Sequence, residues 1–124
     1  MFLLTATFAL GFLYLSVALF FAWLLKNNFN FLGFIYNPAN KKVFFIFDLI
    51  GIPLCILAIL EQVHWFLMVL FLMHVLNSGA LLLYSDNFYE VENEMRELGE
   101  PAIINFMIGM LSVAGIFCIY ITYL

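Results

Sequence analysis

Residues Val43 to Tyr84 read VFFIFDLIGIPLCILAILEQVHWFLMVLFLMHVLNSGALLLY and contain no lysine or arginine. The acidic and histidine residues of this run are Asp48, Glu61, His64 and His74. One helix of these 42 residues would measure roughly 63 Å, about twice the hydrocarbon thickness of a bilayer. The run must therefore fold back, and the polar residues 61–64 near its middle predict a very tight turn. We expect a helical hairpin of two membrane spans, 43–60 and 65–84.

The composition of the whole chain indicates an all-α integral membrane protein. Of its 124 residues, 67% are hydrophobic and 10% are charged, and the mean hydropathy is +1.13. Soluble domains are about 45–50% apolar and about 25% charged, because they must present a polar surface to water. Four Lys and Arg residues exclude the usual nucleic-acid footprint. Cys55 and Cys118 fall inside expected spans and have no metal-ligand spacing, so we expect neither a metal site nor a disulfide.

Two further apolar segments complete a single membrane domain, 1–124, with four spans. The first, 2–25, is free of charge up to Lys26 and lacks the features of a cleaved signal peptide, so we expect it to be retained. The last, 102–123, has tyrosines near its end, where they favour the headgroup level. In the first span, the small-residue pairs Thr7/Gly11 and Ala18/Ala22 either let another helix approach closely or reflect chance.

The two long loops, 26–42 and 85–101, differ in character. The first is rich in asparagine. In the second, Glu90, Glu94 and Glu97 repeat at helical spacing on one face, and apolar residues repeat on another. This pattern predicts a short acidic amphipathic helix before the fourth span. Interfacial helices that bind lipid by charge are usually basic, so we expect the acidic face to meet water or a basic partner protein.

All four basic residues fall in these loops and therefore on one side of the membrane. They are Lys26, Lys41, Lys42 and Arg96. The positive-inside rule then places both termini on the outer side and both loops in the cytoplasm, or in the matrix of a mitochondrion. We therefore expect a multi-pass protein of the bacterial inner membrane or of the mitochondrial inner membrane.

Polar side chains within the spans are the first places to look for function, because a central charge costs about 2.5–3.5 kcal/mol on insertion scales. His74, Asn77 and Ser78 share one face of the third span. They form either a functional group, such as a quinone donor, haem ligand or proton relay, or a patch that fixes helix packing. Asp48 is either paired with the lysines before it or a carboxylate that carries ions or protons. If the hairpin is symmetric about residues 61–64, Asp48 and His74 differ in depth by about 4–5 Å. We therefore expect a contact through water between them rather than a direct hydrogen bond.

The histidines of the chain do not predict a resident cofactor. His64 and His74 lie on the same side of the turn, roughly 15 Å apart along one helix, so they cannot clamp one haem. Haem would require a second chain. We expect no metal, and we expect no enzyme, because the sequence contains no GxSxG, HExxH, Walker or GxGxxG pattern.

Three functions fit these features. The first is a small accessory or structural subunit of a larger membrane complex, including energy-transducing ones, with other membrane subunits and lipid as its partners. Its support is that the spans are apolar around their whole circumference. The second is a homo-oligomeric ion channel or small transporter that uses Asp48 and His74. The third is a membrane anchor that handles haem or quinone through His74.

Overall fold

In the computed structural model, residues 5–83 and 85–123 are described, and their regular structure is entirely helical. The four long helices are α1 (Ala6–Lys26), α3 (Lys41–Glu61), α4 (Trp65–Leu83) and α7 (Glu100–Thr122). Each is long and apolar enough to cross a membrane. The expected all-α class with four helices able to span a membrane is therefore confirmed, and it is consistent with a multi-pass membrane protein. Residues 2–4 of the first expected span and Tyr84 of the third lie outside the described residues.

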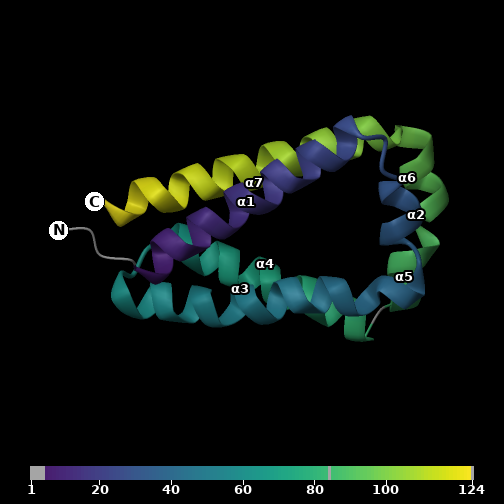
Figure 1. Ribbon diagram of the computed structural model, residues 1–124. Coiled ribbons are helices and arrows are strands. Elements are labelled where there is room, and N and C mark those ends of the chain that lie inside the picture. Colours follow the sequence, from purple (N-terminus) through teal and green to yellow (C-terminus); the bar gives the residue numbers. More distant parts are fainter. Residues whose placement is uncertain (1–4, 84, 124) are drawn as a thin grey trace.

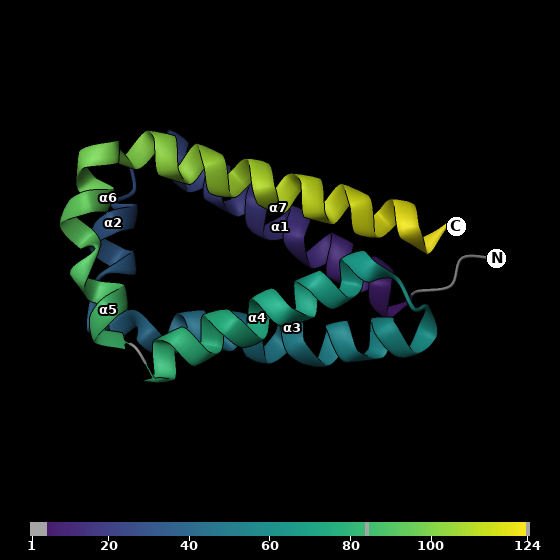
Figure 2. The ribbon, with the colours of Figure 1, turned by 180° about the vertical axis from the view of Figure 1, so that it is seen from behind.

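The four spans are arranged as two helix pairs that form a wedge (Figure 1). Helix α1 packs along α7, α3 packs along α4, and α1 also contacts α3. The pairs converge at the end that holds the start of α1, the end of α7 and the α3–α4 connection, and they diverge toward the opposite end. A layer of short helices, the loop layer, covers the wide end of the wedge (Figures 1 and 2).

Small residues allow α1 and α7 to approach each other closely. A Cβ atom built on Gly11 would lie 2.8 Å from the carbonyl oxygen of Gly115, so neither position has room for a side chain without a shift. Thr7 and Ala18 are buried on the same face of α1 as Gly11, whereas Ala22 is exposed. Both residues of the predicted pair Thr7/Gly11 thus lie on the buried face of α1. Of the pair Ala18/Ala22, only Ala18 lies on that face.

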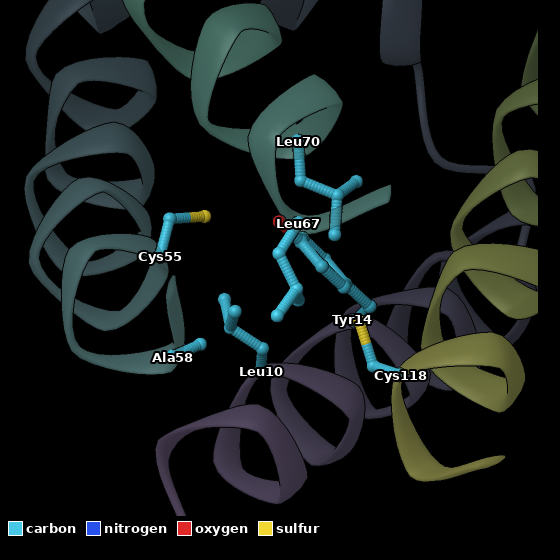
Figure 3. Close-up of a cluster of buried hydrophobic side chains, with 7 residues drawn as sticks. All are labelled: Leu10, Tyr14, Cys55, Ala58, Leu67, Leu70 and Cys118. Atoms are coloured by element: carbon cyan, nitrogen blue, oxygen red, sulfur yellow. The ribbon is translucent and has the colours of Figure 1, made fainter. Parts of the chain in front are cut away.

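The apolar core lies toward the narrow end of the wedge. Figure 3 shows its side chains converging from all four spans: Leu10, Tyr14, Cys55, Ala58, Leu67, Leu70 and Cys118. Both cysteines are free and fully buried, which matches their expected role as small apolar residues. The core therefore includes one phenol, that of Tyr14, in an otherwise apolar cluster.

At the narrow end, side chains accept hydrogen bonds from backbone amides in the first turn of α1. The Thr5 hydroxyl accepts a hydrogen bond from the Phe8 amide at 3.1 Å, which caps the start of α1. The Glu61 carboxylate, at the end of α3, accepts from the Ala6 amide at 3.1 and 3.3 Å. A carboxylate at a helix N-terminus also complements the helix dipole. Glu61 therefore joins two spans, in addition to marking the polar connection that the sequence indicated.

The loop layer consists of α2 (Phe31–Ile35), the 3-10 turn η1 (Pro38–Asn40), α5 (Ser85–Glu90) and α6 (Glu92–Leu98). The structure thus divides segment 85–101, expected to hold one amphipathic helix, into two short helices separated at Val91. The Glu100 carboxylate at the start of α7 accepts from the Phe31 amide, so the two loops are linked across the layer. Burial, together with the nearby Glu92 carboxylate, raises the pKa of the Tyr36 phenol in this layer.

Candidate functional site

Four polar side chains from three spans form one continuous hydrogen-bonded network inside the wedge. Asn77 Nδ2 donates to Asp48 Oδ2 at 2.9 Å, and His74 Nδ1 donates to Asp48 Oδ1 at 2.8 Å. His74 Nε2 lies 2.6 Å from the Tyr14 hydroxyl. With its proton on Nδ1, a neutral imidazole accepts at Nε2, so the Tyr14 hydroxyl then donates. We call this set, Tyr14, Asp48, His74 and Asn77, the polar network.

The helices position these groups through local spacing and one absent side chain. His74 and Asn77 are three residues apart on α4 and therefore share the face that meets α3. A Cβ atom on Gly51 would lie 2.7 Å from His74 Cε1, so the imidazole packs directly over the backbone of α3. The ring of Tyr14 stacks on the His74 ring at a centroid distance of 5.9 Å. The Phe47 ring packs against the same imidazole at a centroid distance of 5.4 Å.

The network is largely shielded from the surroundings of the protein. Asp48 is 1% exposed, Tyr14 3% and His74 6%, while Asn77 is exposed. A polar group without a partner in hydrocarbon costs several kcal/mol, on the order of 2–7 in transfer experiments. Both Asp48 oxygens and both His74 nitrogens have partners here, so the network joins α1, α3 and α4 without leaving those atoms unpaired.

The direct contact between Asp48 and His74 corrects the expectation that their depths would keep them apart. The depth difference between Asp48 and His74, counted along the helices, is close to one helical turn. Asp48 and Gly51 are separated by the same distance, one turn, on one face of α3. Because the imidazole lies over Gly51, its Nδ1 reaches Asp48 across that turn. The buried hydrogen-bond partner of Asp48 is accordingly His74. The alternative of an ion pair with Lys41 or Lys42 is replaced by this arrangement.

The structure assigns different roles to the remaining sequence candidates. Ser78, half-buried on α4, lies outside the polar network. His64 Nδ1 accepts from the Phe66 amide at 3.1 Å and so caps the start of α4. In His74, both ring nitrogens are engaged, which leaves neither available to a haem iron in this arrangement. Among the described residues, no group of three His, Cys, Asp or Glu side chains could hold a metal ion.

The acidic candidates lie in the loop layer, away from the polar network. Glu90 is on α5, Glu94 and Glu97 are on α6, and all three are exposed. Glu92, their neighbour on α6, pairs with Arg96 at 2.8 Å. These residues remain a candidate docking face for a basic partner.

Sequence reasoning missed Tyr14, Gly51 and Phe47. A signal for Tyr14 was present, because tyrosine favours the headgroup level and this one lies in mid-span. A hydroxyl at that depth needs a partner from another helix. No comparable signal identifies Gly51, whose importance depends on which ring lies against it.

A cleft of about 700 Å³ lies beside the polar network, between α4 and α7. These two helices lie apart over most of their described length (Figure 2) and meet at the narrow end, where the ring centroids of Phe66 and Phe117 are 4.5 Å apart. Apolar side chains form almost the whole wall of the cleft. From α4 they include Phe66, Val69, Leu70 and Met73, and from α7 Phe106, Met110, Val113 and Ala114. All four network residues border the same cleft.

Comparisons of the chain with protein-family models, curated proteins and solved structures find no match.

Proposed function

We propose that this chain is a small structural subunit of an integral membrane protein complex, without catalytic activity of its own. The observation that carries the proposal is the polar network, whose buried groups bond to one another across three spans. Interhelical hydrogen bonds of this kind contribute to the specificity of helix packing in lipid. The network therefore suits a scaffold that holds a defined shape within a membrane.

The depth of the network supports a structural role over conduction. Counted along the helices, its residues lie roughly 9–18 Å from the ends that face the loop layer, at about 1.5 Å per residue. Polar groups that conduct ions or protons form a path between the two membrane surfaces. The network instead occupies one range of depth, bounded on the narrow side by the apolar core of Leu10, Cys55 and Leu67.

The outward faces of the spans support assembly with other subunits. In an apolar 18-residue window of each span, between 17% and 22% of the residues are buried within the chain. Large apolar side chains face outward on every span, for example Leu19, Leu57, Leu76 and Ile116. A span so little covered by its own chain must be covered by lipid or by other helices, and helices of partner subunits would use these faces. The acidic loop layer would add a docking site for a basic partner.

Site-specific crosslinking in the native membrane tests this proposal. A photoreactive amino acid is placed at an outward position of each span, in turn Leu19, Leu57, Leu76 and Ile116, at native expression level. We expect at least one position to yield a discrete adduct with another protein, and the same protein to co-purify in mild detergent. The buried position Leu10 is the matched control, since its crosslinks should remain within the chain. Lipid adducts alone at all four positions, with the chain purifying by itself, would contradict the proposal.

A second candidate function is transport by a homo-oligomer, and one observation favours it. Asp48 and His74 form a buried, hydrogen-bonded pair of ionisable side chains beside the cleft, and ionisable side chains inside membrane spans mark substrate and proton pathways. Flux assays in liposomes with the wild-type chain and the Asp48→Asn variant separate the two functions. Ion flux that depends on Asp48 would favour transport, whereas absent flux, or flux that survives the substitution, would favour the scaffold.

A further inference from the structure

We infer that the cleft between α4 and α7 binds a neutral lipid whose small head carries a hydroxyl or carbonyl group. This inference concerns a binding site and does not rest on the proposed structural role. It stands on three observations: a polar group with unused bonding capacity, the charge beside that group, and the dimensions of the cleft.

The polar group is the side-chain amide of Asn77. One of its N–H groups donates to Asp48 Oδ2, and its carbonyl and second N–H take no part in the polar network. Asn77 is exposed and borders the cleft, about six residues or roughly 9 Å inside the end of α4. At that depth water cannot satisfy the amide, so a hydrogen-bonding ligand in the cleft would relieve an unfavourable exposure. A hydroxyl can both donate to and accept from an amide, and a carbonyl can accept from it.

The charge of the site indicates a neutral head. The Asp48 carboxylate lies 2.9 Å behind the Asn77 nitrogen, so an anionic head on Asn77 would meet a negative charge in a low-dielectric medium. A cationic head cannot reach that carboxylate directly, because Asp48 is 1% exposed and both of its oxygens already accept hydrogen bonds. A charged head would also lose its hydration on moving below the headgroup level, whereas a hydroxyl or carbonyl loses far less.

The dimensions of the cleft indicate a lipid chain. The cleft extends along α4 from Asn77 to Phe66, roughly 16 Å, which is about half of the hydrocarbon thickness. A transmembrane helix from a partner would need a groove along the whole span. A volume of about 700 Å³ is that of a site for one small amphiphile. The apolar wall below Asn77 would accommodate the chain, with the head toward the loop layer and the tail toward the narrow end.

Photolabelling of the full-length chain in nanodiscs tests the inference. The probe is a long-chain alcohol that carries a diazirine in its alkyl chain. We expect saturable labelling of α4 and α7, competed by an unlabelled long-chain alcohol or a short-tailed prenyl benzoquinone. A fatty acid or an alkylammonium of the same length should not compete. Equal competition by the charged amphiphiles would overturn the choice of a neutral head.

Two glycines provide a matched pair of variants. A Cβ atom at Gly109, on the cleft wall, or at Gly79, outside it, would meet no atom within 4 Å, so both positions tolerate a side chain. Gly109→Leu should fill the cleft and abolish saturable labelling, whereas Gly79→Leu should leave it unchanged. Asn77→Leu should weaken labelling about five-fold, the effect of one hydrogen bond. Unsaturable labelling of the wild type, or labelling that survives Gly109→Leu, would overturn the site.

The alternative occupant, a helix of another protein, has its own readout. A photoreactive residue at Val113, an exposed position on the cleft wall, reports what occupies the cleft in native membranes. Adducts of lipid mass are expected. A discrete protein adduct there would overturn the inference in favour of a partner helix.

Discussion

Tyr14 places a phenol in the middle of a membrane span, where its hydroxyl has no water to bond with. The structure satisfies this hydroxyl with His74 Nε2, and the same ring carries the link onward to Asp48. Each of these residues is therefore positioned by the others. An imidazole anchored at both nitrogens has a fixed orientation, which no single partner would give it.

Removing only the Tyr14 hydroxyl should measurably weaken the fold. We expect Tyr14→Phe to lower the free energy of unfolding by about 0.5–1.5 kcal/mol, the range for interhelical hydrogen bonds in membrane proteins. Reversible unfolding in mixed micelles gives this quantity. Tyr120→Phe, at an exposed tyrosine of α7, is the control and should have little effect. Because the hydroxyl acts through His74, Tyr14→Phe should cost much less in a His74→Leu background, and full additivity would contradict the network.

Gly51 should be sensitive to the addition of one methyl group. A Cβ atom there would lie 2.7–2.8 Å from two atoms of the His74 ring, so Gly51→Ala must displace the imidazole from Asp48. We expect a loss of about 1–3 kcal/mol, typical of overpacking, in the same unfolding assay. Gly79→Ala, on open space of α4, should be neutral or slightly stabilising. In a His74→Ala background the cost of Gly51→Ala should largely disappear, and its persistence would show that another contact is responsible.

At the scale of helices, the wedge depends on how closely α1 and α7 pack. Within a bilayer the association of helices relies on van der Waals contact, and small residues bring two backbones together. Gly11 and Gly115 supply this contact. Helix α1 also packs against α3 and so connects the α1–α7 pair to the α3–α4 pair. The polar network and Glu61 add polar links between the two pairs at different depths.

A side chain at the α1–α7 contact should therefore open the wedge. We expect Gly11→Ala to destabilise the chain by about 1–3 kcal/mol, because its Cβ atom would lie 2.8 Å from a backbone oxygen that cannot rotate away. Gly109→Ala, on a part of α7 with open space, is the matched control. Spin labels on α1 and α7 should also report a larger separation in the first variant only. An unchanged separation together with unchanged stability would refute this account.

The sequence predicted the spans well because their signal is local. A helix that crosses the hydrocarbon core of a bilayer must be apolar over its length, and a hydropathy average over consecutive residues detects this property. Both ends of α3 and the start of α7 extend beyond the expected spans, because the helices continue through the charged residues Lys41, Glu61 and Glu100. The division of segment 85–101 at Val91 was not predicted, since periodicity alone does not distinguish one short helix from two.

The sequence identified the residues of the polar network that lie on α3 and α4, but it did not predict the hydrogen bonds between them. Asp48, His74 and Asn77 were identified because polar residues are conspicuous in apolar spans. Their direct contact was not expected, because counting residues gives depth along a helix and says nothing about a ring seated over Gly51. Tyr14 was missed because its partner lies 60 residues away in the sequence.

At the scale of the whole molecule, the wedge has two chemically different ends. The start of α1, the end of α7 and the α3–α4 connection lie at the narrow end, and the loop layer lies at the wide end (Figure 1). The basic residues Lys26, Lys41 and Arg96 belong to the wide end, by their positions at the end of α1, at the start of α3 and in α6. The positive-inside rule therefore predicts that the wide end faces the cytoplasm or the mitochondrial matrix.

Cysteine accessibility should report this orientation. The native cysteines, Cys55 and Cys118, are fully buried, so an impermeant maleimide should react only with an introduced thiol. In sealed, right-side-out membranes we expect Val63→Cys, at the narrow end, to react and Glu94→Cys, in the loop layer, to react only after permeabilisation. Both positions are exposed, so a difference between them reflects the side of the membrane rather than burial. The reverse pattern would place the acidic loop layer outside, where a basic cytoplasmic partner could not reach Glu90, Glu94 and Glu97. The accessibility result therefore tests the orientation and, with it, the docking face on which part of the proposed assembly depends.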